Sequence, residues 1–424
     1  MNTASFRHWV IIALVTAVAL PALILRSLII ADAPHPDLGA VGESVLFGLG
    51  ILAAALLLTW ASEVAETEIS QTLALAAIAL IAVLPEYAVD VYFAWTAPHE
   101  PDNAHLAIAN MTGGNRLLVG FAWPLIFLVF WLKTKRKFLP VGGQNSVGIL
   151  FLGVATLYSF SIPIRGHLSL LDTGVMFTLF GVYLYFSSRT PAREVDVFVG
   201  PAQAIAALPL VRRRVLIVLI FLYAAAVIFA SAEPFAEGLV HTGEKLGVDE
   251  FILVQWVAPL ASESPEFLLA ALLAARGRAA AGMSILISSK VNQWTVLIGS
   301  LPLAYSISGT TLSPLDFDSR QAEEVFLTAG QSLFAVVIFI SLSMSLLEAA
   351  LLAVLFLTQL FFLDTTVRLG YGVGYISLAL FLLLRQLSVL PAFLKVTRSA
   401  VVDPHTISSE SPLEELVYGK DEKT

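Results

Sequence analysis

The chain has 424 residues, of which 58% are hydrophobic and 13% are charged, and its formal net charge is −8. Soluble domains contain about 25% charged and about 45–50% apolar residues, so this composition indicates a protein integral to the lipid bilayer. No polar stretch is long enough for a separate catalytic or nucleic-acid-binding domain, and the lack of cysteine excludes disulfides and thiolate metal sites.

The apolar segments predict twelve membrane-spanning helices, because each is long enough to cross about 30 Å of hydrocarbon. The first is longer than the apolar core of a signal peptide and no small-residue cleavage pattern follows it, so we expect it to be retained. The tenth and eleventh spans result from dividing one long run at Ser343-Met344-Ser345. The predicted spans are residues 9–31, 41–62, 70–96, 105–132, 145–163, 168–187, 214–232, 249–275, 280–308, 324–343, 346–363 and 371–394.

Basic residues in the loops predict the orientation of these spans. Lysine and arginine clusters follow the fourth, eighth and twelfth spans and separate the sixth from the seventh, whereas the loops on the opposite face are acidic. Since basic loops stay on the cytoplasmic side, we expect both termini in the cytoplasm and the protein in the cell (plasma) membrane. The polar residues after the last span predict a disordered cytoplasmic tail.

The chain contains an internal repeat whose clearest mark is a proline–glutamate step. Pro85-Glu86 lies in the third span and Pro265-Glu266 in the eighth, and these two spans are predicted to cross the membrane in opposite directions. Three further pairs of segments match in the same order and at similar separations, which indicates a duplication. The pairs are Ala61-Ser62-Glu63 with Ser231-Ala232-Glu233, Gly120 with Gly299, and Leu170-Leu171-Asp172 with Leu346-Leu347-Glu348.

The predicted fold class is therefore an all-α integral membrane protein with an inverted 5+5 transmembrane helix repeat and an extra helix at each end. The sequence does not indicate an oligomeric state. The predicted organisation is an N-terminal extra helix (1–40), a first inverted repeat (41–190), a cytoplasmic basic linker (191–213), a second inverted repeat (214–365), a C-terminal extra helix (366–395) and a cytoplasmic tail (396–424).

The glutamates of the Pro-Glu steps lie deep in apolar segments, where a charge costs about 3 kcal/mol or more. A proline removes a backbone donor, so each helix should be kinked or broken beside Glu86 and Glu266, which would free carbonyl oxygens. Asp90 falls on the same helical face as Glu86, one turn further on. Carboxylates and free carbonyls on broken midplane helices are typical of the ion sites of secondary transporters. These acids could instead form structural ion pairs.

Polar residues near both steps could complete a cation site. Ser262 and Glu263 precede the second step and add a hydroxyl and a carboxylate. Oxygen ligands of these kinds suit hard cations such as Na⁺ and Ca²⁺, and they do not suit soft metals. The small residues around them could serve helix packing alone. The downstream candidates are Asn110 and Asn115 after the first step, and Ser289 and Gln293 after the second.

These regions resemble the paired alpha-repeats of the cation/Ca²⁺ exchanger superfamily, the sodium/calcium exchanger-like membrane proteins. That family's pattern is approximately Gly-Thr-Ser-Leu-Pro-Glu, followed by Gly-Asn-x-x-Gly-Ser-Asn. The resemblance implies ten core helices in inverted repeats, alternating access at a central site, and Glu86 and Glu266 as the principal cation ligands. The similar segments are 81–86, 109–116, 261–266 and 284–293, within a resemblance that covers about residues 40–365.

The chain departs from the family's pattern at several of these positions. Where the family's first repeat has threonine and serine, this chain has Ala82 and Val83, so those hydroxyls are absent. Two basic residues, Arg116 and Lys290, occur within the motif regions. These changes make the composition of the cation site differ from the one that the resemblance implies.

The two basic residues allow different interpretations. Lys290 could pair with Glu263, could stand in for one cation or titrate during the cycle, or could extend its ammonium to the membrane interface. Arg116 stays charged, so we interpret it as a structural partner of Asp90 or Glu86. The first two interpretations of Lys290 favour fewer ions per cycle or proton coupling.

The sequence thus predicts a secondary-active cation antiporter that exchanges Ca²⁺ or Na⁺ for Na⁺ or H⁺ by alternating access. Its partners would be inorganic cations and the lipid bilayer, without nucleic acid or cofactor. The altered site residues support an alternative, a transport-inactive membrane scaffold or sensor built on the exchanger fold. An intramembrane hydrolase is less well supported, because Glu86 and Asp90 are not accompanied by a second aspartyl motif or a Ser/His dyad. We therefore do not expect an enzyme.

Overall fold

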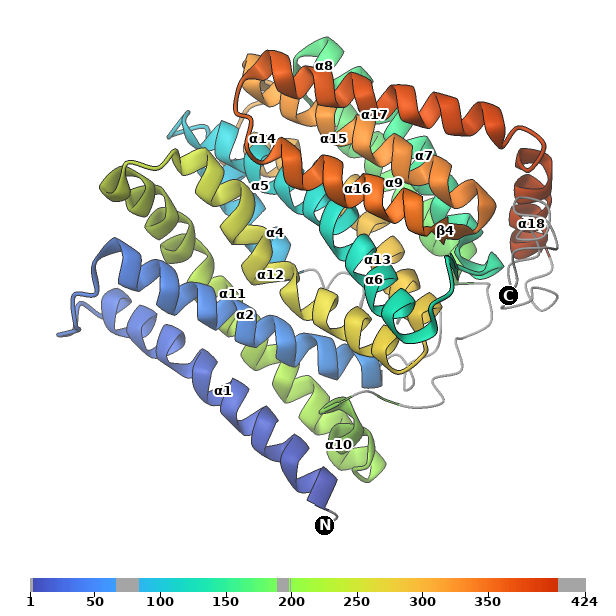
Figure 1. Cartoon of the computed structure of the whole chain (residues 1–424). Helices are drawn as coiled ribbons and strands as arrows, with labels where there is room; N and C mark the ends of the chain where they lie inside the picture. Colours follow the sequence, from blue (N-terminus) through green and yellow to red (C-terminus); the bar gives the residue numbers. More distant parts are fainter. Residues whose placement is uncertain (1–2, 66–83, 189–197, 199, 403–424) are drawn as a thin grey trace. The chain divides into compact units, whose positions relative to one another are not determined.

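The computed structural model describes residues 3–65, 84–188, 198 and 200–402 (Figure 1). These residues are almost entirely α-helical, which agrees with the predicted all-α class. Within the described ranges, nine helices are long and apolar enough to cross a membrane, and a shorter apolar helix, Leu346–Gln359, accompanies them. The chain is therefore an integral membrane protein with many apolar helices.

The residues group into two compact units, each of which combines segments from both halves of the chain. Unit 1 comprises Met1–Asn110 and Ala192–Leu269. Unit 2 comprises Met111–Pro191 and Ala270–Thr424. Each unit thus contains part of each predicted repeat.

Three helices of unit 1 lie side by side, namely α1 (Thr3–Ile30), α2 (Gly39–Ala65) and α11 (Leu210–Leu246) (Figure 1). Their contacts depend on small residues. A Cβ atom placed on Gly48 would lie 2.8 Å from the Phe235 ring, and one on Gly50 would lie 2.7 Å from Ala22. Such close backbone approach is typical of helix interfaces in membranes, where packing contacts take the place of the hydrophobic effect.

α11 is longer than predicted. The sequence predicts a basic linker over 191–213 and a span over 214–232, whereas α11 begins at Leu210 and continues to Leu246. A short helix, α10 (Ala202–Ala206), also lies within the predicted linker and packs against α2. Arginine is a good helix former, so the helix continues through the basic residues beyond its apolar part. It ends where Gly247 adopts the left-handed φ of 66°.

Unit 2 contains two π-helical turns among its described residues, η1 (Leu118–Ala122) and η3 (Gln293–Leu297). Such turns are rare and are frequent at functional sites. Each joins two helices into one long span. The helices around them and the remaining helices are α5 (Asn103–Leu117), α6 (Trp123–Thr134), η2 (Gly143–Asn145), α7 (Ser146–Ser159), α8 (Ser161–Arg165), α9 (Leu170–Ser187), α13 (Ala279–Asn292), α14 (Ile298–Ser308), α15 (Ser319–Ile338) and η4 (Phe339–Ser341).

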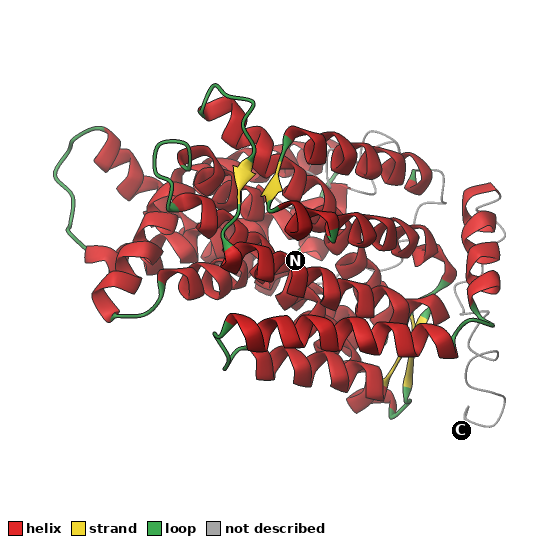
Figure 2. Cartoon of the chain, turned by 90° about the horizontal axis from the view of Figure 1, so that it is seen from above, coloured by secondary structure: helices red, strands yellow, loops and turns green. Residues whose placement is uncertain are grey.

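Two short antiparallel ladders connect loops of unit 2 within the described residues, and the sequence predicts neither (Figure 2). β1 (Phe138–Pro140) pairs with β4 (Ser343–Ser345), with Leu139 opposite Met344. β2 (His167–Leu168) pairs with β3 (Leu315–Asp316). Each strand has only two or three residues, so the alternating pattern that identifies a strand is too short to recognise.

The predicted division of one long run at Ser343-Met344-Ser345 is confirmed. α15 ends at Ile338, and η4 and β4 separate it from α16 (Leu346–Gln359). α16 begins with a capping box, in which the Glu348 backbone N–H donates to Ser345 Oγ and the Ser345 N–H donates to the Glu348 carboxylate. A capping box also begins α9, with Ser169 and Asp172 in the same roles.

The C-terminal region differs from the prediction. A single span over 371–394 was expected, but α17 (Thr365–Arg385) ends earlier and α18 (Leu390–Val402) follows after a short turn. The first residues of the predicted disordered tail, 396–402, are therefore helical, and the rest lie outside the described residues. Phe393, Thr397 and Ala400 form the buried face of α18, which packs against α7. Their spacing is the helical i, i+4, i+7 pattern.

Candidate cation site

The glutamates of the two Pro-Glu steps come together in unit 1. Glu86 lies on α4 (Leu84–Thr96) and Glu266 on α12 (Glu250–Ala275), and their carboxylates interact electrostatically. Glu86 is 4% exposed, and its Oε2 has no hydrogen-bond partner among the described residues. Glu266 is partly buried. Two like charges that interact outside bulk water repel each other unless a proton or a cation lies with them.

A second polar pair lies one turn along α4. The Asn110 side chain at α5 forms a hydrogen bond with the Asp90 carboxylate, and Asp90 also interacts electrostatically with Glu86. Both side chains are buried. Asp90 Oδ1 and Asn110 Oδ1 have no hydrogen-bond partner in the part of the chain that the structure describes. Buried oxygens are rarely left unsatisfied, so these atoms are available to a cation, a proton or a water molecule.

The second Pro-Glu helix is not broken. α12 continues from Glu250 to Ala275 with Pro259 and Pro265 inside it. Of the two alternatives predicted for this step, a kink or a break, the break is therefore wrong. Serine hydroxyls bond to its backbone: Ser262 Oγ donates to the Ala258 and Pro259 carbonyls at 3.3 and 3.4 Å. Hydroxyls of this kind help a membrane helix to continue past a proline.

The segment before the first Pro-Glu step, residues 66–83 with Ala82 and Val83, lies outside the described residues. On α12, Ser262 and Glu263 are both buried, on the turn that precedes Glu266. The predicted site residues in unit 1 are therefore Glu86, Asp90, Asn110, Ser262, Glu263 and Glu266, on α4, α5 and α12.

The other predicted site residues lie in unit 2, where Lys290 contacts Asn115. The Lys290 Nζ donates to Asn115 Oδ1 at 2.7 Å and to the Asn115 carbonyl at 3.3 Å. It also lies 4.4 Å from the centre of the Trp294 ring, a cation–π contact. Lys290 is fully buried, so the interpretation that its ammonium extends to the membrane interface is wrong.

Ser289 and Gln293 follow the same helical segment. Both are buried, and Ser289 Oγ, Gln293 Oε1 and Gln293 Nε2 have no hydrogen-bond partner among the described residues. Gln293 is the first residue of the π-helical turn η3. These are neutral oxygen ligands that a hard cation could use. Whether they bind one in this chain stays a prediction.

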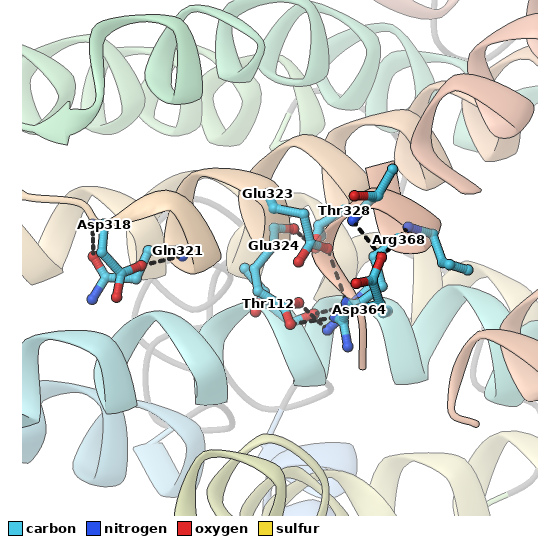
Figure 3. Close-up of polar contacts among 11 residues, drawn as sticks. Thr112, Asp318, Gln321, Glu323, Glu324, Thr328, Asp364 and Arg368 are labelled. Atoms are coloured by element: carbon cyan, nitrogen blue, oxygen red, sulfur yellow. Dashed lines mark hydrogen bonds and ion pairs between the residues drawn. The ribbon is translucent and has the colours of Figure 1, made fainter. Parts of the chain in front are cut away.

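Arg116 belongs to a buried charge network with three residues that Figure 3 labels, namely Glu323, Glu324 and Arg368. Arg116 on α5 forms an ion pair with Glu324 on α15, and Glu324 also accepts from Arg368 on α17. Arg368 Nε donates to Glu323 Oε1 at 2.9 Å. The four side chains are at most 6% exposed. The partner that the structure gives Arg116 is thus Glu324, where the sequence suggested Asp90 or Glu86.

Acidic and histidine side chains do not cluster further. In the described ranges, no group of three or more His, Asp or Glu side chains is arranged to hold a metal ion. A cation bound in unit 1 would therefore combine the charged pair Glu86 and Glu266 with neutral oxygens. Such sets of carboxylate, amide and carbonyl oxygens are typical for hard cations.

Comparison with known proteins gives matches over most of the chain. The model of the sodium/calcium exchanger protein family matches residues 40–189 and 216–384. The crystal structure of the H⁺/Ca²⁺ exchanger CAX is similar with a TM-score of 0.87 and 40% sequence identity, covering 94% of this chain and 99% of that one. A search of curated proteins found no match.

Two more distant structures share the fold. Native YfkE is similar with a TM-score of 0.60 and 16% identity, covering 86% of this chain and 99% of that one. The sodium-calcium exchanger NCX_Mj, soaked with 2.5 mM Na⁺ and 0.1 mM Ca²⁺, gives a TM-score of 0.51 and 16% identity over 75% of this chain and 97% of that one. At these identities the likeness concerns the fold alone.

Proposed function

Because the chain belongs to the sodium/calcium exchanger protein family, a family of transporters and not of enzymes, we propose that it is an H⁺/Ca²⁺ antiporter with Glu86 and Glu266 as its principal cation ligands. The observation that carries this proposal is the interaction of the Glu86 and Glu266 charges in unit 1, together with a buried Glu86 oxygen that has no hydrogen-bond partner among the described residues. The similarity to an H⁺/Ca²⁺ exchanger at 40% identity supports H⁺ as the counter-ion.

The glutamate pair also explains how one site could couple two ions. Two ionised carboxylates that interact with each other away from bulk water are unfavourable unless a cation neutralises them. A Ca²⁺ ion would do so directly, and protons would do so by converting the carboxylates to carboxylic acids. Because either ligand removes the need for the other, the site alternates between Ca²⁺ and H⁺ as access changes from one face to the other.

An amide, a hydroxyl and a third carboxylate would complete this site. Asn110, Ser262 and Glu263 lie in the same unit as the glutamate pair, and the orphan Asn110 Oδ1 supports a ligand role for that residue. Asp90 would orient Asn110 through their hydrogen bond. The ligand roles predicted for the unit 2 residues, Asn115, Ser289 and Gln293, stay predictions.

The contacts within unit 2 support an inverted repeat. In the proposed repeat, β1 is equivalent to β3, and β2 is equivalent to β4. The β1–β4 ladder of one face is therefore equivalent to the β2–β3 ladder of the other. It also relates the capping box of α9 to that of α16, and the π-helical turn η1 to η3. We therefore propose two five-span repeats over about 41–190 and 214–365, with α1 and α17 as the extra helices.

The ladders also support the proposed orientation. β1 and β4 lie in loops that the charge distribution assigns to the cytoplasm, whereas β2 and β3 lie in loops assigned to the opposite face. Strands can pair only when their loops emerge on the same face, and both ladders meet this condition. The proposal places both termini in the cytoplasm of a protein in the plasma membrane.

Calcium flux in proteoliposomes tests the proposed function. Wild-type protein should accumulate Ca²⁺ when a pH gradient is imposed, and Glu86→Gln and Glu266→Gln should each abolish this flux. Glu250→Gln is the matched control, since it makes the same change at the start of α12. Flux that survives in both site variants would refute the assignment. Wild-type protein without flux or Ca²⁺ binding would favour the transport-inactive scaffold or sensor.

A further inference from the structure

We propose that the Lys290 ammonium is a built-in cation that occupies a set of oxygen ligands suited to a free Na⁺, and that it makes Ca²⁺ exchange insensitive to Na⁺. The proposal concerns the choice of counter-ion, so it rests on the proposed function. It assigns a specificity role to a residue of unit 2 that contributes no carboxylate to the glutamate pair.

The surroundings of the Lys290 Nζ are those of a cation site. Two oxygens of Asn115, the side-chain amide oxygen and the backbone carbonyl, accept from it, and the face of Trp294 lies on it. Amide and carbonyl oxygens are the neutral ligands of hard cations, and an aromatic face attracts a cation through its quadrupole. The ammonium thus takes up ligands that a free monovalent cation would need.

The orientation of the Asn115 amide is fixed by a second hydrogen bond. Its Nδ2 donates to the Met111 carbonyl at 2.8 Å, one turn back along α5. The oxygen must therefore point the other way, toward Lys290. An amide held in this orientation presents an oxygen to a positive charge whether that charge belongs to a side chain or to an ion.

The positions of Asn115 and Lys290 in the two repeats explain why a positive charge is needed at their contact. Asn115 and Lys290 are separated by 175 residues, and each lies three residues before a π-helical turn. They are thus equivalent positions, and their contact joins the two repeats to each other. If position 290 carried an amide like Asn115, two amide oxygens could face each other across this contact. A cation between them would then balance their partial negative charges. Lys290 supplies that charge covalently.

Neighbouring groups could bind an ion if the ammonium were removed. Gln293 Oε1 is buried and has no hydrogen-bond partner among the described residues. Gln293 lies one helical turn from Lys290, on the same face. With asparagine at 290, Gln293 Oε1 and both oxygens of Asn115 would remain for a free Na⁺. A lysine-to-asparagine change should therefore create Na⁺ sensitivity and not only remove a contact.

The experiment compares wild type, Lys290→Asn and the charge-preserving Lys290→Arg in proteoliposomes. Ca²⁺ uptake is measured with pH and Na⁺ gradients varied independently. Na⁺ should change the apparent Ca²⁺ affinity of wild type and K290R less than about twofold, and that of K290N about fivefold or more, the lower end of usual coupling between sites. A wild type that responds to Na⁺ like K290N would overturn the proposal. So would a K290N protein that exchanges Ca²⁺ for H⁺ and ignores Na⁺.

Thermal unfolding in detergent provides a second readout that needs no transport. Na⁺ should raise the Tm of K290N, because a ligand that binds only the folded protein stabilises it, and should leave the Tm of wild type unchanged. If K290N does not fold, Lys290→Gln replaces it, and a Na⁺-dependent Tm of wild type still overturns the proposal. A wild type without H⁺/Ca²⁺ exchange would refute the proposed function, while the Na⁺ dependence of Tm would still decide the role of Lys290.

Discussion

Removing Arg368 should destabilise unit 2 strongly, because it leaves a buried acid without its counter-charge. Arg368 donates to both Glu323 and Glu324, and all three side chains are buried (Figure 3). In Arg368→Met, Glu324 keeps its ion pair with Arg116, whereas Glu323 loses the arginine that now holds it. Removing one partner of a buried ion pair costs about 3–5 kcal/mol.

The expected shift is large enough to measure by thermal unfolding in detergent. For a folded body of about this size, 1 kcal/mol shifts the Tm by about 2–4 °C, so R368M should lower it by about 6–20 °C. The exposed Arg385 on the same helix provides the matched control, and Arg385→Met should shift the Tm little. Intrinsic tryptophan fluorescence can follow the transition.

A second substitution distinguishes charge imbalance from lost packing. R368M combined with Glu323→Gln neutralises the acid that R368M leaves behind, so this double variant should recover much of the lost Tm. R368M combined with Glu324→Gln should recover less, since Glu324 is also the acceptor of Arg116. Equal Tm values for R368M and R385M would refute the account of the network. Equal recovery by the two double variants would show that packing, and not charge balance, determines the loss.

Two further predictions concern the packing and capping of unit 2. Gly120→Ala should reduce the yield and the Tm of the folded protein, because the added Cβ would collide with the Phe356 ring. The control is Gly174→Ala, whose added Cβ has no atom within 4 Å, so its Tm should be unchanged or slightly higher. Ser345→Ala should destabilise the start of α16 by about 1 kcal/mol, since it removes the hydroxyl that accepts from the Glu348 N–H; an unchanged Tm in S345A would contradict this role for the capping box.

The apolar spans could be predicted within a few residues because the thickness of the membrane sets their length. The sixth span was predicted over 168–187 and is helical over Leu170–Ser187. The polar ends of helices could not be predicted in this way. α11 continues beyond its apolar part at both ends, and α18 is a short amphipathic helix that hydropathy does not detect. Its buried face was present in the sequence as a periodic pattern.

The candidate site was predictable where burial made a residue costly. Glu86 and Glu266 were identified because carboxylates in apolar segments need an explanation. The charge network was missed, since Glu323 and Arg368 lie just outside the predicted spans 324–343 and 371–394, where charged residues are ordinary. The partner of Lys290 depends on tertiary contacts. The repeat offers a signal in retrospect, because Lys290 and Asn115 occupy equivalent positions.

The two kinds of buried carboxylate in this protein differ in the sign of the charge beside them. Glu324 lies between two arginines, which balance its charge, so nothing is gained by binding an ion there. Glu86 interacts with a second glutamate, so the pair is unfavourable until a cation or proton joins it. The Glu324 network therefore stabilises the folded protein. The Glu86–Glu266 pair destabilises it until a cation or a proton binds. Neutralising Glu324 should therefore lower the Tm, whereas neutralising Glu86 should abolish transport and leave the Tm unchanged or higher.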